Sequence, residues 1–303
     1  MALQLRQNED IDAGIRRVIA GRIDAALREL QGPELRDRNV HNTRKRLKEI
    51  RGVLRLVRPA LRELYKPQNR IFRDAARPLS ALRDARILIA ALDSLTPQAV
   101  RDVRETIAAL QEQLRARKRA IGQTLRRDGG PLDEIRSSLS AAERGLVDWP
   151  ALPHGWRTVG RGLKRVYRDG RRAMARAVNR SDENLHEWRK QVKWLWYQLE
   201  VLEVAWPPMM QVLQQQAHHL SDLLGDIHDL AVLRAELEGE LGHDLPRETR
   251  EQLLALIQER RSALTADVFA VGQCLYLERP SHFVRRIRGY WKLRGSVARA
   301  CDE

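Results

Sequence analysis

A short segment of the chain places a histidine and three basic residues at helical spacing, an arrangement suited to holding an anion. His41, Arg44, Lys48 and Arg51 fall on one stripe of a helix that turns about 100° per residue. Surface helices usually mix glutamate with lysine or arginine four residues apart, because such pairs stabilise the helix. No acidic residue interrupts this stripe, so its cations repel one another unless an anion lies beside them. The pattern therefore predicts an anion-binding helix.

The same pattern returns 145 residues later, which indicates an internal duplication and a shared function for both copies. Each copy begins with a histidine. A single such histidine is usually a core residue, but the same place in both copies favours a hydrogen bond to a phosphate oxygen. Trp196 stands where the first copy has Arg51, and Glu200 where it has Arg55, so the second stripe is expected to be shorter. The identical pairs are His41/His186, Arg44/Arg189, Lys45/Lys190 and Lys48/Lys193.

Two further segments gather arginines on one helical face. Arg165, Arg168 and Arg172 follow one another at spacings of three and four residues, and Arg115 and Arg119 are four residues apart. Any one of these faces could simply be solvated, because charged helix faces usually point to water. Several basic faces on neighbouring helices of both copies favour anion binding instead. These five arginines therefore join the candidate site.

The composition points to a polyanionic partner. The chain of 303 residues carries 55 lysines and arginines against 40 acidic residues, a formal net charge of +15. Arginine outnumbers lysine, and its planar group makes forked contacts to phosphate. The expected partners are nucleic acid, a membrane surface or a free phosphate polymer.

The cellular compartment is predicted from what the sequence lacks. The two cysteines, Cys274 and Cys301, match no metal spacing and no disulfide framework, as is typical of a reducing compartment. The first residues lack the apolar core of a signal peptide, and no segment approaches the roughly 20 apolar residues that span a bilayer. We therefore expect a cytoplasmic protein with no membrane partner.

Apolar residues recur every three or four positions along nearly the whole chain, so the sequence predicts an all-α protein. Two units of four long helices predict two four-helix bundles, over 8–127 and 155–295, joined by a linker over 128–154. Because the units are related by duplication, they are expected to pack with approximate twofold symmetry. The expected helices are 10–30, 38–65, 69–92, 97–127, one short helix in the linker, 155–179, 182–206, 209–241, 246–277 and a short final helix, 280–295.

Signals for catalysis and metal binding are weak. Asp84 and Asp229 occupy the same place in both copies and are expected to hold a basic side chain of the stripe. His218, Asp222 and Asp229 share a helical face, so a metal site is an alternative, but structural ion pairs explain the same residues. The sequence contains no glycine-rich phosphate loop and no cluster of carboxylates for paired metal ions. We therefore predict no catalytic residue, no metal site and no cofactor.

The two His-led motifs, each followed in the next helix by a segment that ends in aspartate, resemble the CHAD family, the conserved-histidine α-helical domain. The resemblance covers about residues 8 to 295, and the segment 165–173 also looks typical of the family's fifth helix. It implies two four-helix bundles about a pseudo-twofold axis with a basic cavity or pore between them. It also implies non-catalytic binding of inorganic polyphosphate, often at polyphosphate granules. The matching positions are His41, Arg44, Lys48, Arg51, His186, Arg189 and Lys193.

The functional hypothesis is a non-enzymatic polyphosphate-binding protein, and two alternatives remain open. A nucleic-acid-binding helical protein would expose aromatic rings beside the cations, and six of the seven tryptophans lie between Trp149 and Trp206. Packing in the core is the usual role of such residues. A polyphosphate-processing enzyme would need clustered acidic metal ligands and would release phosphate. Chain-length preference and oligomeric state do not follow from the sequence.

Overall fold

The computed structural model describes residues 3–31, 36–125, 127 and 130–301, and these residues form helices and connecting turns with no strand. This confirms the all-α fold class. The helices of the first half are α1 (Ile11–Leu30), α2 (Asp37–Leu61), α3 (Tyr65–Ala75), α4 (Ser80–Leu95) and α5 (Arg101–Leu125). They are followed by α6 (Pro131–Arg144), the short helix expected in the linker. The second half contains α7 (Trp156–Arg176), α8 (Asp182–Val201), α9 (Pro207–Glu238), α10 (Arg247–Leu275) and α11 (Pro280–Cys301).

The helix predicted over 69–92 is in fact two helices, and the prediction was wrong there. The break between α3 and α4 contains Pro78. Proline lacks the N–H that a helix interior needs, and it disfavours helical geometry in the preceding residue. Helix α8, which carries the second His-led motif, begins as expected, because the Ser181 hydroxyl accepts a hydrogen bond from the backbone N–H of Asn184 at 3.3 Å. The final helix runs on to Cys301 and is longer than predicted.

The described residues form two apolar cores, and each contains residues of both halves of the chain. The larger core combines α1, α2, α3 and α6 with α7, α8, α11, the first part of α9 and the end of α10, and it takes in Leu82 of α4 and Leu125 of α5. The smaller core combines α4 and α5 with the end of α9 and the first part of α10. Each core thus draws on both halves, and the halves are held together by shared burial of apolar surface. The predicted boundary at 127/128 adjoins residues outside the described ones, and the internal duplication stays a prediction.

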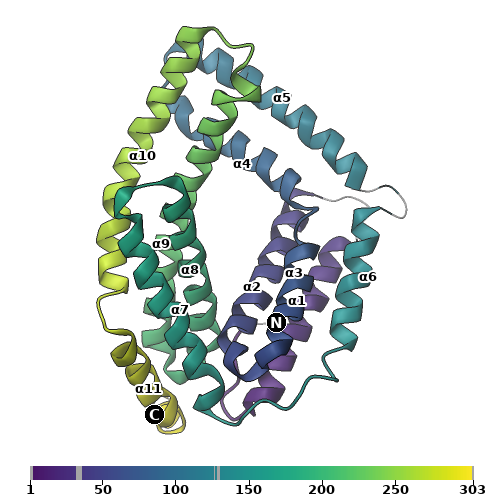
Figure 1. Cartoon of the computed structure of the whole chain (residues 1–303), viewed down its shortest axis with the longest axis vertical. Coiled ribbons are helices and arrows are strands. Elements are labelled where there is room, and N and C mark those ends of the chain that lie inside the picture. Colours follow the sequence, from purple (N-terminus) through teal and green to yellow (C-terminus); the bar gives the residue numbers. More distant parts are fainter. Residues whose placement is uncertain (1–2, 32–35, 126, 128–129, 302–303) are drawn as a thin grey trace.

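The arrangement of the helices brings α2 and α8, the two helices that carry the His-led motifs, into contact. In Figure 1, α1, α2, α3 and α6 lie on one side and α7 to α10 on the other, while α4 and α5 extend across one end. α2 packs against both α7 and α8, and α4 packs against α9. Among the described residues, no helix combines the length and the apolar character needed to cross a bilayer.

Two glycines of α7 and α2 allow the helices of the two halves to approach closely. A Cβ atom on Gly162 would lie 1.8 Å from the backbone oxygen of Leu56, and one on Gly52 would lie 2.8 Å from the Cβ of Tyr197. Real atoms do not approach this closely, so larger residues at these positions would force the helices apart. The glycines therefore set the distance between α2 and its neighbours.

We expect Gly162→Ala to lower the free energy of unfolding by about 1–3 kcal/mol, the usual cost of overpacking a core. Chemical denaturation measures this change. Gly289→Ala is the matched control, because a Cβ atom there would meet nothing within 4 Å. Equal stability of the two variants would contradict a close α2–α7 contact.

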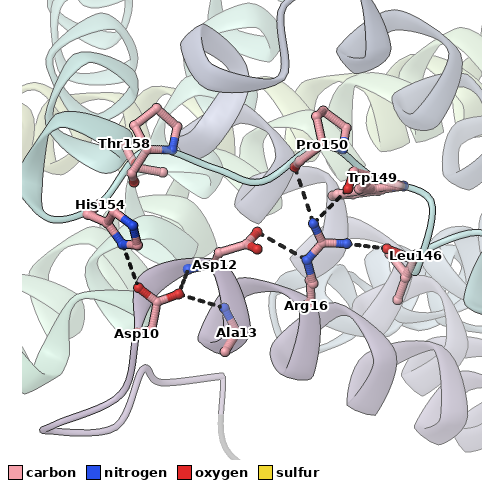
Figure 2. Close-up of polar contacts among 10 residues, drawn as sticks. Asp10, Asp12, Ala13, Arg16, Leu146, Trp149, Pro150, His154 and Thr158 are labelled. Carbon is pink, nitrogen blue, oxygen red and sulfur yellow. Dashed lines mark hydrogen bonds and ion pairs between the residues drawn. The ribbon is translucent and has the colours of Figure 1, made fainter.

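The connection between the halves is fixed to the beginning of α1, as Figure 2 shows. The guanidinium of Arg16 donates to the backbone oxygens of Leu146, Trp149 (2.9 Å) and Pro150 (3.2 Å). His154 contacts the carboxylate of Asp10 at 3.0 Å, and the same carboxylate caps α1. The predicted linker is thus an ordered part of the structure where it is described.

Candidate anion-binding site

A cavity of about 320 Å³ lies between α2, α4, α8 and α9. α2 and α8 are the two helices that carry the His-led motifs, so the fold brings one face of each motif to the same space. Seven arginines and lysines line the cavity against four aspartates. The basic lining residues are His41, Arg44, Lys45 and Lys48 of α2, Arg83 and Arg86 of α4, Arg189 and Lys193 of α8, and His218 of α9.

Lys48 and Lys193, which occupy equivalent places in the two motifs, both line the cavity. Burial, followed by the charges of Arg189 and Arg83, lowers the pKa of Lys193 to about 7. Burial and the charge of Lys193 hold the pKa of Lys48 well below its ordinary value. Within the described part of the chain, neither ammonium group has a hydrogen bond or an ion pair. Such desolvated cations would be stabilised by an anion between them.

Arg44 reaches the cavity from α2 while it anchors the turn between α3 and α4. Its Nη1 donates to the backbone oxygen of Ala76 at 2.6 Å and to the hydroxyl of Ser80 at 2.8 Å. Burial and the charge of Arg83 lower the pKa of Arg44 to about 10. Arg44 therefore combines a structural role with a position at the cavity, and replacing it would disturb both.

Arg189, the counterpart of Arg44, lies against the backbone of α9. A Cβ atom on Gly225 would lie 3.3 Å from Nη2 of Arg189, so the glycine makes room for the guanidinium. Burial lowers the pKa of Arg189, and the charge of Asp229 opposes this effect. The Nε of Arg189 is buried without a hydrogen-bond partner among the described residues. The site thus holds a further cation whose hydrogen-bonding capacity is unused.

The wall formed by α9 is acidic. Burial works against the charge of Asp229, but the bond from His228 at 3.1 Å and the charges of Arg189 and Arg83 keep its pKa below the ordinary value. Burial and the charges of Asp229 and Asp222 raise the pKa of Asp226. These carboxylates partly offset the cations; the sequence analysis singled out Asp222 and Asp229 but not Asp226. No group of three potential metal-ligating side chains able to hold an ion is found within the described ranges.

The two aspartates expected to hold the basic stripe both contact Arg83 instead. Asp84 lies 3.2 Å from the guanidinium of Arg83, and Asp229 lies 3.9 Å from it. Their charges nevertheless act on the stripe: the charge of Asp84 opposes the lowering of the Arg44 pKa by burial, and the charge of Asp229 does the same for Arg189. The carboxylates thus act on the stripe across space, while Asp84 accepts a hydrogen bond from Arg83 of α4 and Asp229 makes its hydrogen bond with His228 of α9.

His41 and His186, equivalent in sequence, have different surroundings. His41 lines the cavity, and burial and the charge of Arg86 lower its pKa. His186 lies outside the lining, with its ring 4.5 Å from that of His228. Burial and the charge of His228 lower the pKa of His186 to about 4. Of the two equivalent histidines, only His41 is therefore placed to face an anion in the cavity.

Arg51 also lies outside the lining of the cavity. It shares the oxygen of Asn69 with Arg55, at 3.1 and 2.9 Å, and the Arg51 guanidinium is 5.3 Å from the centre of the Trp194 ring. Burial and the charge of Arg55 lower the pKa of Arg51 to about 10. The first basic stripe therefore leaves the cavity after Lys48.

The other predicted site residues are on outer surfaces. Lys190 forms an ion pair with Glu187, and Arg165 and Arg168 face Asp169 at 3.7 and 3.2 Å. Arg172 is exposed. Arg115 and Arg119 lie at 3.4 and 3.1 Å from Glu112 on the exposed side of α5. None of these residues lines the cavity, and their role in anion binding stays a prediction.

The sequence analysis missed Lys45, Arg83 and Arg86 as site residues. Lys45 had been noted as half of an identical pair, and Arg83 and Arg86 share one face of α4 beside the Asp84 position. Three-residue spacing was therefore a usable signal, but it could not show that α4 packs against α2 and α9 and so lines the cavity.

The tryptophan cluster serves mainly as packing. Trp149, Trp188 and Trp194 expose only 6%, 0% and 7% of their surface. Trp196 does line the cavity, with the ammonium of Lys45 5.9 Å above its ring. A continuous platform for stacked bases is not formed by the buried rings.

Glu200, the residue that replaces an arginine of the first stripe, is a partly buried carboxylate. Burial and the charge of Glu49 raise its pKa to about 7. We expect Glu200→Gln to raise the free energy of unfolding by about 1–2 kcal/mol at pH 8 and to change little at pH 5. The sign follows because, between about pH 4.5 and pH 7, the unfolded chain releases the proton of Glu200 while the folded chain keeps it, so the destabilisation by this carboxyl grows over that window and is complete above it. Denaturation at the two pH values tests this, and an equal effect at both would contradict it.

Comparison with known proteins places the chain among helical domains. The model of the CHAD domain family matches residues 18–238. A crystal structure of the CHAD domain from the plant Ricinus communis is similar, with a TM-score of 0.70 and 18% identity, over 92% of this chain and 96% of that one. PptA from Streptomyces chartreusis is similar over 89% of this chain and 100% of that one, with a TM-score of 0.61 and 12% identity. No curated protein sequence gives a significant match.

Proposed function

Because the chain belongs to the CHAD family, we propose that it binds inorganic polyphosphate in the cavity between α2, α4, α8 and α9, without changing it chemically. The family resemblance carries the expectation of polyphosphate binding. The geometry adds a place for it, since the basic faces of α2 and α8 converge there. Association with polyphosphate granules in the cytoplasm is part of the same proposal.

The observation that supports the proposal most strongly is the pair of Lys48 and Lys193. Two like charges from different halves of the chain share a cavity, and within the described residues no acid pairs with either. Holding them there costs free energy in the unliganded protein. A phosphate chain would offset that cost with charge-assisted hydrogen bonds, and the surrounding arginines offer forked donors for successive phosphates.

The experiment that tests the proposal is a titration with long-chain polyphosphate, single-stranded DNA and RNA of matched charge at about 0.15 M salt. We expect polyphosphate to bind at least about tenfold more tightly, because buried tryptophans such as Trp188 cannot stack on bases. Equal binding of all three polymers would overturn the assignment.

The same samples can test whether the protein is an enzyme. We expect no release of phosphate or shortening of the chain after prolonged incubation with Mg²⁺ or Mn²⁺. Release that depends on a metal ion would replace the binding function with a polyphosphate-processing activity. Gel analysis of chain length detects either outcome.

A further inference from the structure

Lys193 combines two properties that together point to covalent chemistry. Its amine faces a cavity rich in arginine, and in the described part of the protein it has no hydrogen-bond or ion-pair partner. A lysine crowded by other cations loses its proton more readily, and only the neutral amine is a nucleophile. An anion-binding cavity also concentrates phosphorylated reagents beside that amine.

Resting on the proposed anion site, we infer that Lys193 is a site of acylation by small acyl phosphates. The phosphate group of the reagent would be held by the cations of the cavity, as a phosphate of polyphosphate would be, and its acyl carbon would meet the amine. The acyl group would turn the Lys193 ammonium, one of the cations that line the cavity, into an uncharged amide. The modification would therefore weaken polyphosphate binding and couple it to the supply of acyl phosphates.

The chemical step is an ordinary acyl transfer. The lone pair of Nζ attacks the carbonyl carbon, and a C–N bond forms. The bond between that carbon and the bridging oxygen breaks, and inorganic phosphate leaves with the electron pair. The nitrogen then loses a proton to water, which leaves a neutral amide. No oxidant, metal ion or second protein is needed.

The surroundings of Lys193 decide how readily its amine becomes neutral. The charges of Arg189 of α8 and Arg83 of α4 favour the neutral amine, and the carboxylates of Asp222 and Asp229 of α9 oppose them. The pKa of about 7 shows that burial and the cations prevail, so roughly half the amine is neutral at pH 7. An ordinary lysine is neutral at that pH in only about one molecule in a thousand. The charged and titratable groups that line the same cavity are His41, Arg44, Lys45 and Lys48 of α2, Arg83 and Arg86 of α4, Arg189 of α8, and His218, Asp222, Asp226 and Asp229 of α9, together with Asp37 at the start of α2.

The test measures acetylation of each lysine in the full chain by mass spectrometry after short exposure to acetyl phosphate at pH 7. Lys190, an exposed lysine almost one turn away on α8, is the internal control. We expect Lys193 to react at least about tenfold faster than Lys190, with the ratio falling as the pH rises toward 10. Long-chain polyphosphate should protect Lys193 and leave Lys190 unchanged.

Acetic anhydride, which carries no phosphate, separates nucleophilicity from anion recognition. A preference for Lys193 that is larger with acetyl phosphate than with the anhydride supports the inference. Equal reaction of Lys193 and Lys190 with acetyl phosphate overturns it, whatever the anhydride does. Because polyphosphate titration is a separate measurement, the inference can fail while the proposed function stands.

Two variants complete the design. Lys193→Gln, which imitates the amide, should bind polyphosphate about tenfold more weakly than the unmodified protein, and Lys193→Arg should retain most of the affinity. Acetyl phosphate should reduce the polyphosphate affinity of the unmodified protein and not that of Lys193→Arg. An equal loss of affinity in both proteins would overturn the inference.

Discussion

The double variant Lys48→Gln/Lys193→Gln is expected to bind polyphosphate about 100-fold more weakly and, at the same time, to be more stable without ligand. Loss of two charge-assisted hydrogen bonds, at roughly 1.4 kcal/mol each, accounts for the loss of affinity. The gain in stability arises because burial and mutual repulsion penalise both ammonium groups in the folded protein. We expect the free energy of unfolding to rise by about 1–3 kcal/mol at pH 7.

Isothermal titration calorimetry and denaturation measure the two effects on the same sample. The logarithm of the binding constant falls linearly with the logarithm of the salt concentration. The slope of this line should become less steep by about 0.7 for each lost phosphate contact, if polyphosphate behaves like a single-stranded nucleic acid. Arg115→Gln/Arg119→Gln is the matched control, since it replaces two basic side chains by glutamine on the exposed side of α5, outside the cavity. Similar losses in both double variants would show that overall charge, and not the cavity, governs binding.

Polyphosphate affinity is expected to fall by up to about tenfold per pH unit between pH 8 and pH 10. The unliganded protein has a Lys193 pKa of about 7, so above that pH the amine is largely neutral. A bound polyanion favours the charged form and raises this pKa toward the ordinary value. Binding above pH 7 therefore takes up a proton, and a higher pH opposes it.

The stability of the unliganded protein should rise with pH, whereas the affinity for polyphosphate falls. Between pH 7 and about pH 10 the unfolded chain binds more protons at Lys193 than the folded chain does, so stability rises with pH over this window. Calorimetry in buffers of different ionisation enthalpy counts the protons taken up at pH 8, and Lys193 is expected to contribute about one of them. Lys193→Arg should take up fewer protons, because its side chain stays charged. Proton uptake unchanged by this substitution would assign the pH dependence to another group.

The sequence by itself determined the all-α class, most helix limits and the residues that share a face of α2 or α8. Helical periodicity is a local property, and it is set by the residues of one segment. Ser181 shows the same, because it acts on the backbone within a few residues as a helix start. Pro78 acts just as locally as a helix break, but the sequence analysis overlooked it and predicted one helix across it. The His-led motifs were likewise visible in the sequence because their spacing lies within one helix.

The tertiary structure alone decided which members of those faces meet. Arg51 belongs to the first stripe by spacing, yet α3 and the Trp194 ring occupy the space beside it. Arg83 and the acidic wall of α9 line the cavity because α4 packs against α2 and α9 packs against α8. Helix crossings depend on apolar contacts between segments far apart in the chain, such as Gly162 against Leu56. A stripe thus fixes where a side chain points on its own helix, and packing fixes what it faces.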